Sequence, residues 1–253
     1  MHDCQFEGNL VGGRNCPVSP TKRRFLCALC VSVVTQCFVL ETIEIARDFE
    51  GAARVGILQI DGVHVQDSPE DLKNMLNGLA AEYAQKYKDQ PLSEIPAVKN
   101  IRSIFHRSGL DPTRYRPSSE SLLRRAVKGK GLYFINSVVD LVNYFSLKLL
   151  WPIGLYDADK VLPPVSWRVR QEGESYEGIG RDMLNLAHFP LLVDQQGPFG
   201  SPISDSMRTR VTGECKRILW VTFAPAGAKV PNAEFAETMI RFNGGVTKVA
   251  KEL

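Results

Sequence analysis

The stretch NSVVDLVNYFSLKLLWPIGLYD, residues 136–157, combines an apolar helical pattern with a polar stripe. Asp140, Asn143 and Ser146 recur at every third position among Val, Leu, Tyr and Phe. On a helix this spacing makes one slanting stripe, surrounded by residues too apolar to face water. A buried polar group without a partner costs about 1–3 kcal/mol. The stripe must therefore either bond to the protein's own backbone and loops or line a cavity, and composition leaves both open.

Two signals predict the ends of this helix. Ser137 has the properties of an N-cap, and Asp140 follows three residues later, where an acid bonds back to the cap. Pro152 disfavours helical geometry at the residue before it. The helix should therefore run from Ser137 to near Leu150 or Trp151.

The flanking sequence predicts helices first and strands later. Ser68-Pro69-Glu70-Asp71 has the pattern of a helix start with Ser68 as the cap. One face of that helix is apolar, with Leu72, Met75, Leu76, Leu79 and Tyr83. The other predicted elements are a buried strand or hairpin at 54–65, a helix at 95–107, strands at 166–170, 190–194 and 217–223, and a last helix near 232–243 that closes the chain. This order favours one compact domain of the α+β class.

The composition is that of an ordinary folded protein. The 253 residues are 44% hydrophobic, and the net charge of +3 does not by itself indicate a nucleic-acid partner. Five of the six cysteines precede residue 38, whereas a disulfide framework would be spread through the domain. Cys27 and Cys30 form a CxxC without the two further ligands that zinc requires. We therefore expect a thiol-reduced, cytoplasmic protein with no metal and no cofactor.

The first 37 residues differ from the rest. A basic triplet, residues 22–24, precedes the apolar run FLCALCVSVVTQCFVL, which is shorter than the roughly 18–20 residues of a membrane span. A signal or anchor is one interpretation, although no small-x-small cleavage site follows. We favour an extension at 1–37 that is disordered or translated from a start codon assigned too early. The domain itself is predicted at 38–225, completed by a helix within 226–253.

Residues 101–130 hold the strongest charge cluster. Eight Lys and Arg stand there against two acids. Arginines that alternate with Tyr115 in a loop rich in Pro and Ser can hold phosphates and stack on a base. Ser118 or Ser119 is a predicted cap for the next helix, whose last turn carries Arg124, Arg125 and Lys128. Cations there also complement the helix dipole, so a solvated surface is the alternative to an RNA contact.

Several spaced motifs surround the opening stretch. They are G-x-D-P-T-R at 109–114, P-S-S-E at 117–120, N-x-V-V-D-x-x-N-Y at 136–144, P-I-G-x-Y-D-x-D-K-V at 152–161, R-x-x-x-x-G-E at 168–174 and D-S-x-R-T at 205–209. Together they resemble the B3/B4 domain of the phenylalanyl-tRNA synthetase beta subunit, and more closely the stand-alone proteins built on that domain. The resemblance covers roughly residues 38–225.

This resemblance implies a tRNA-linked module of mixed α+β architecture. Helices occupy its first half, and its strands form a multi-stranded β-sandwich of unusual topology. The expected partner is the aminoacylated acceptor end of a tRNA, with neither DNA nor a membrane as partner. The residues expected to contact RNA are Arg114, Arg116, Arg124, Arg125, Lys128 and Lys130.

In the synthetase, the corresponding domain houses a pocket that hydrolyses tyrosine wrongly attached to the tRNA. Carried over to this chain, the pocket would be lined by Asn136, Asp140, Asn143, Tyr156 and Asp157. The polar stripe would then shape its wall.

One difference from the synthetase sequence leaves two functional hypotheses open. The synthetase has a His at the position of Gly154, so the obvious imidazole is missing and the sequence names no catalytic residue. A deacylase that clears mischarged aminoacyl-tRNA in trans is one hypothesis. A non-catalytic RNA- or amino-acid-binding module that kept the fold is the other. Synthetase class motifs are absent, so we do not expect the chain to charge tRNA itself.

Overall fold

The computed structural model describes residues 39–184 and 187–253. Our predictions for residues 1–37 lie outside that part of the chain. The elements are, in order, β1 (Glu44–Ile45), β2 (Ala53–Asp61), α1 (Glu70–Lys86), η1 (Leu92–Glu94), α2 (Pro96–Ser108), α3 (Ser118–Val127), α4 (Ser137–Leu149), β3 (Ile153–Asp157), η2 (Ala158–Lys160), β4 (Ser166–Val169), β5 (Tyr176–Glu177), β6 (Met183–Leu184), β7 (Pro190–Asp194), β8 (Gly197–Gly200), β9 (Arg217–Pro225), α5 (Asn232–Asn243) and β10 (Val246–Glu252).

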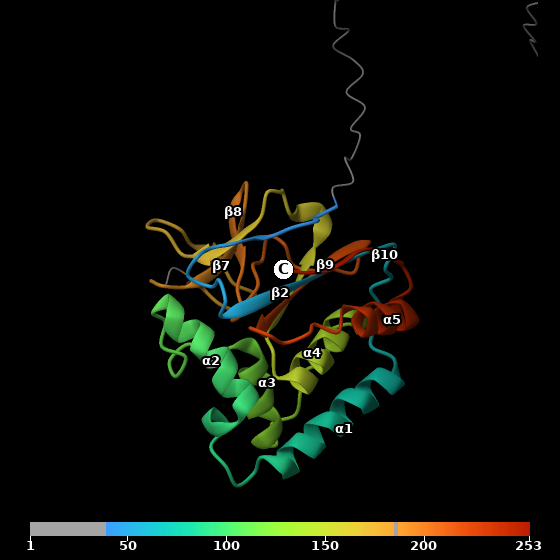
Figure 1. The fold of residues 1–253 in the computed structure, drawn as a ribbon. Helices are drawn as coiled ribbons and strands as arrows, with labels where there is room; N and C mark the ends of the chain where they lie inside the picture. The colour runs from blue at the N-terminus through green and yellow to red at the C-terminus, as the bar shows by residue number, and fades with distance from the viewer. Residues whose placement is uncertain (1–38, 185–186) are drawn as a thin grey trace, which may run out of the picture. The chain divides into compact units, whose positions relative to one another are not determined.

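Two four-stranded sheets form a sandwich. One has the strand order β1-β4-β7-β8 and the other β10-β2-β9-β3, while β5 and β6 make a separate short ribbon. Side chains of both sheets share one apolar core, in which the rings of Trp167 on β4 and Phe223 on β9 lie 5.2 Å apart. Figure 1 shows β7 and β8 on one side of β2 and β9, with α1, α3 and α4 on the other.

The central strand β2 is buried on both faces. Val55 and Ile57 point into the core between the sheets, whereas Leu58 and Ile60 point into a second core under the helices. Strand β9, its antiparallel neighbour, alternates in the same way. Continuous apolar runs such as RVGILQI are the expected sequence of strands covered on both faces.

Helices cover the outer face of the β10-β2-β9-β3 sheet. Val138, Leu141 and Phe145 of α4 pack with Phe235 of α5 over that sheet. The ring of Phe235 stacks on Trp220 of β9, with 4.7 Å between the centroids. A third core joins α1, α3 and α4, so the helical layer is held by the sheet and by its own apolar faces. Among the residues that the structure describes, no helix is long and apolar enough to cross a membrane.

The predicted α+β class is confirmed, and the sandwich is present. Helices α1 to α4 precede most of the strands, and the predicted strands at 166–170, 190–194 and 217–223 correspond to β4, β7 and β9. One prediction was wrong, because the helix near 232–243 does not close the chain. Strand β10 follows it and pairs with β2 at the edge of the sheet.

The predicted helix caps need correction. Pro69 and Pro117 precede α1 and α3, and neither start has a side-chain cap. Ser68 instead donates to a distant carboxylate, and Ser119 donates to the Leu150 carbonyl. Helix α4 is capped by Asn136, whose side chain accepts from the amides of residues 138 and 139. Its C-cap is Leu150, as the proline signal predicted.

Tyr156 of β3 is fully enclosed between two glycines. A methyl group on Gly154 or on Gly200 would lie 2.6 Å from its Cζ atom and closer still to its hydroxyl. Neither glycine has a positive φ, so both positions need glycine because of space rather than backbone conformation. The ring therefore fixes how closely β3 and β8 approach each other across the core.

We predict that Gly154→Ala lowers the free energy of unfolding by about 1–3 kcal/mol, the usual cost of overpacking a filled core. Gly213→Ala is the matched control, because a methyl group there meets nothing within 4 Å. Urea unfolding of the two variants measures the difference. An unfolding midpoint for Gly154→Ala equal to that of the control would contradict the tight packing.

Candidate RNA-binding surface

Five of the six predicted RNA-contacting cations line one cleft. Its volume is about 190 Å³, and it lies along α3 and the turn that follows. The lining residues are Arg116, Ser121, Arg124, Arg125, Lys128 and Lys130. Residues 121, 124, 125 and 128 come together because positions three and four apart share one face of a helix. Arg114, the sixth predicted residue, lies outside the cleft, with its guanidinium 5.2 Å from the Tyr115 ring.

Most of these cations have no acidic partner. Within residues 39–184 and 187–253, no carboxylate lies within 4.0 Å of the charged groups of Arg124, Lys128 or Lys130. Glu120, an acid on α3, is engaged by a bidentate contact with Arg102 at 2.6 and 2.8 Å. It leaves only a 3.8 Å contact to Arg116. The cleft is therefore a site of uncompensated positive charge, as anion binding requires.

Three exposed apolar side chains follow the cleft residues in the chain, and the first of them contacts the cleft residue Arg125. Tyr133 is 67% exposed, Ile135 is 62% exposed and Phe134 is 40% exposed. The Arg125 guanidinium lies 4.0 Å from the Tyr133 ring centre and also donates to the Gly131 carbonyl, 3.2 Å away. Sequence reasoning missed this feature, because an apolar run between two helices predicts burial. The signal was the neighbouring Gly129 and Gly131, which mark a turn.

Internal hydrogen bonds explain two of the three residues in the polar stripe of α4. The buried Asp140 carboxylate accepts from the Ser68 hydroxyl at 2.5 Å and from the Ile135 amide at 3.0 Å. Burial raises the pKa of Asp140, and these two hydrogen bonds oppose the rise. Ser146 donates to the Trp151 carbonyl at 2.8 Å and so supports the C-terminal end. Asn143 is half-buried, and its side chain makes no hydrogen bond within the described part of the chain.

The five residues predicted to line a substrate pocket lie in different surroundings. Asn136 and Asp140 hold the start of α4, and Tyr156 is in the core of the sandwich. Asp157 contacts Lys160 at 3.0 Å and accepts from the Asp159 amide at 3.2 Å. The described cavities are lined by other residues. The predicted pocket therefore stays a prediction.

The D-S-x-R-T motif builds a separate polar region. Arg208 forms two contacts with the buried carboxylate of Asp194, at 2.9 and 3.1 Å. Ser206 and Thr209 share a hydrogen bond of 3.0 Å. A cavity of about 490 Å³ opens beside them, lined by Ser175, Tyr176, Glu177, Gln196, Pro198, Ser206, Met207 and Arg208. Sequence reasoning named the motif but assigned it no role.

Asp205, the first residue of that motif, carries a fully buried carboxyl. Its Oδ1 atom is closed off from solvent, and its Oδ2 accepts from the Leu155 amide at 3.2 Å. Burial raises the pKa of Asp205 to about 7, against the opposing effect of its hydrogen bonds. The nearby Tyr156 hydroxyl is also buried, and its pKa is raised well above the usual value by burial and by the Asp205 charge.

The Asp205 carboxyl predicts a pH dependence of stability. Its pKa is about 7 in the folded state, against about 3.9 for an unperturbed Asp, so the folded chain keeps a proton between these values that the unfolded chain releases. Stability should therefore fall as pH rises from about 4 to about 7, by at most about 1.4 kcal/mol per pH unit from this group. Urea unfolding across this range should show that slope reduced in Asp205→Asn.

Asp89→Asn serves as the control, because Asp89 is exposed on the surface. It should keep the slope of the unchanged protein. Equal slopes in all three proteins would mean that Asp205 does not hold its proton in this range.

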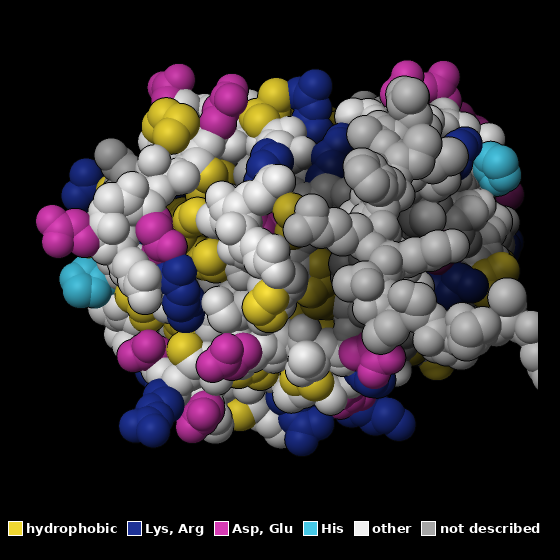
Figure 2. Space-filling model, turned by 90° about the horizontal axis from the view of Figure 1, so that it is seen from above, with side chains coloured by type: hydrophobic (Ala, Val, Ile, Leu, Met, Phe, Trp, Pro, Cys, Tyr) yellow, Lys and Arg dark blue, Asp and Glu magenta, His cyan; other side chains and the backbone are white. Residues whose placement is uncertain are grey.

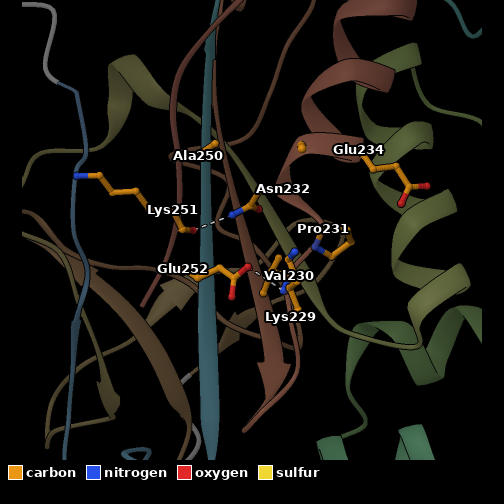
Figure 3. A pocket seen from close by; sticks show the side chains of 9 residues that line it. Lys229, Val230, Pro231, Asn232, Glu234, Ala250, Lys251 and Glu252 are labelled. Atoms are coloured by element: carbon orange, nitrogen blue, oxygen red, sulfur yellow. Dashed lines mark hydrogen bonds between the residues drawn. The ribbon is translucent and has the colours of Figure 1, made fainter.

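Two other surfaces contrast with the cleft. A cavity of about 760 Å³ lies between the start of α5 and β10 (Figure 3). Two charges on its walls are already paired, because Lys251 contacts Glu41 at 3.0 Å and Glu252 contacts Arg54 at 3.1 Å. On the face seen in Figure 2, basic and acidic side chains of the described residues are interspersed.

The chain matches one domain family and is similar to several known proteins. The model of the B3/4 domain family matches residues 100–235. The phenylalanine–tRNA ligase beta subunit of Pasteurella multocida is 31% identical over 131 residues, which are 49% of this chain and 16% of that protein. The uncharacterized protein YhzB of Bacillus subtilis is 23% identical over 173 residues, covering 68% of this chain and 77% of YhzB.

A solved structure is also similar. It is an N-terminal fragment of the phenylalanyl-tRNA synthetase beta subunit from Pyrococcus horikoshii, with a TM-score of 0.43 and 15% identity over 85% of this chain and 54% of the fragment. The chain spans only about a sixth of the length of the ligase subunit from Pasteurella multocida.

Proposed function

This chain belongs to the B3/4 domain family, and from that premise we propose that it binds RNA, with the acceptor end of a tRNA as the ligand. The α3 cleft is the binding surface. Phosphates bind between its cations, and no sequence-specific contact is required for such binding.

The cleft carries this proposal because five cations converge there, and among the described residues only Arg116 has an acidic partner within 4.0 Å. A solvated surface, the alternative from the sequence, has no need to gather five cations around one cavity. Helix dipole compensation explains cations in the last turn of α3, but it does not explain Arg116 before the helix or Lys130 after it. Phosphate oxygens are the ligands that such a cluster favours.

Hydrolysis of a mischarged aminoacyl-tRNA is the second candidate function. The observation that favours it is the cavity of about 490 Å³ beside the D-S-x-R-T motif, whose size suits a small ligand. The Ser118 amide at the start of α3 donates to the Pro202 carbonyl, 2.9 Å away, in the loop that leads to this motif. Helix α3 is about 15 Å long, so a short unpaired end of an RNA can extend from the cleft along the helix towards the cavity.

We predict that Arg124→Ala and Lys128→Ala each weaken the binding of deacylated tRNA. Each removed phosphate contact should also reduce the slope of log affinity against log salt by about 0.7–0.9. Fluorescence anisotropy at several salt concentrations measures both quantities.

Lys248→Ala is the matched control, since Lys248 is an exposed cation on β10, away from α3. It should leave affinity and slope unchanged. If all three variants lost affinity equally, binding would depend on total charge and not on the cleft.

Deacylation is tested with a panel of mischarged aminoacyl-tRNAs that includes tyrosine on the tRNA for phenylalanine. We predict ester hydrolysis faster than the spontaneous rate. Glu177→Gln, which removes a carboxylate from the cavity wall, should slow this hydrolysis, whereas Asn143→Ala should slow it if the pocket lies at α4 instead. Glu172→Gln removes an exposed carboxylate outside the cavity and is the control.

The panel separates the two functions. Bound tRNA without acceleration on any member would rule out the deacylase and leave an RNA-binding module. Acceleration that neither Glu177→Gln nor Asn143→Ala affects would place the hydrolytic site elsewhere.

A further inference from the structure

We propose that Tyr133 stacks on an unpaired base, so that the part of the RNA bound beside the cleft is single-stranded. This inference rests on the proposed RNA-binding function and adds the class of ligand that the cleft accepts. It is carried by the aromatic segment, residues 132–135 between α3 and α4, which none of our sequence predictions included.

The exposure of this segment needs an explanation. Three consecutive large apolar side chains, Tyr133, Phe134 and Ile135, are all at least 40% exposed. Single exposed apolar residues are ordinary on a protein surface, but a contiguous group marks an interaction site. An apolar side chain can be buried at this place, because the neighbouring Leu132 packs in the core of the helical layer.

The segment is held in place by its backbone. The Ile135 amide donates to the buried Asp140 carboxylate at 3.0 Å, and the Asn136 side chain caps α4. At the other end, Arg125 donates to the carbonyls of Gly131 and Lys130, at 3.2 and 3.4 Å. A platform held at both ends loses little conformational freedom on binding, which favours affinity.

The Tyr133 ring is already arranged for stacking. Arg125 covers it at 4.0 Å, while two thirds of the side chain stays open to solvent. An aromatic ring beside cations is the arrangement by which proteins bind unpaired nucleotides, since the base stacks while the phosphate meets a positive charge. Charge complementarity therefore selects a nucleic-acid strand as the occupant, because the uncompensated cations of the cleft begin directly beside the ring.

The test compares two synthetic RNA duplexes of equal charge, one with an unpaired 3′ end and one blunt. Tyr133→Ala should weaken binding of the first about ten-fold, in line with the loss of one stacked base, and leave the blunt duplex unaffected. Tyr133→Phe should retain the affinity, because the ring is kept. The salt slope should not change in either variant, because no cation is removed. A fluorescent base analogue in the overhang should be quenched by the unchanged protein and by Tyr133→Phe only.

Each of the other outcomes contradicts either the proposed RNA binding or the proposed stacking. If neither RNA binds, the proposed function fails, and this inference fails with it. If both RNAs bind and Tyr133→Ala weakens them equally or not at all, RNA binding stands and the stacking platform is refuted. The aromatic segment could instead contact a second copy of this chain, and sedimentation of the free protein tests this. A dimer that Tyr133→Ala dissociates would assign the segment to that second copy and refute the platform.

Discussion

The buried carboxylate of Asp140 is the interaction on which the helical layer depends. It joins the segment before α1, through Ser68, to the segment after α3, through the Ile135 amide, and it does so from the first turn of α4. A charged group that is fully enclosed is tolerated only when it is paired or hydrogen-bonded, so each of the two donors matters. The segment before α1 is therefore held at the same point as the two neighbouring segments around the start of α4, and the aromatic segment takes a defined path between two helices.

This arrangement places the two candidate sites on different layers. The basic cleft belongs to the helical layer, whereas the polar cavity belongs to the strands around β5 and β8. Helix α3 is the connection, because its start contacts the loop of the D-S-x-R-T motif and its end carries the cations. A ligand that uses both sites must be elongated, and a nucleic-acid strand meets that requirement better than a free amino acid.

Periodicity and turn residues predicted most of the fold, and the failures have physical causes. The runs PLLVD and RILWVTF identify β7 and β9 because both are buried on two faces. Strand β10 was not predicted, because edge strands carry charges that discourage pairing with other chains. Its sequence VTKVAKE buries only Val249. The cap of α4 was placed one residue late, since Asn136 and Ser137 are almost equally good caps and only the backbone distinguishes them. Helical spacing was sufficient to gather Arg124, Arg125 and Lys128, whereas the position of Tyr133 depends on side-chain contacts that periodicity does not show: Arg125 lies over its ring, and Asp140 holds the Ile135 amide.

The lack of space for an imidazole at Gly154 depends on the packing of both β3 and β8, and not on that position alone. With the Tyr156 ring packed as it is here, even a methyl group at Gly154 has no room, and Gly200 leaves none on the opposite strand. A His at that position would displace the ring from the core. Of the residues that resemble the synthetase pocket, Asn136 caps α4 and Tyr156 packs in the core, while Asn143 makes no side-chain hydrogen bond in the described part of the chain. The proposed RNA binding requires no imidazole at Gly154, because Arg124, Lys128 and Lys130 have no acidic partner among the described residues and the Tyr133 side chain is exposed.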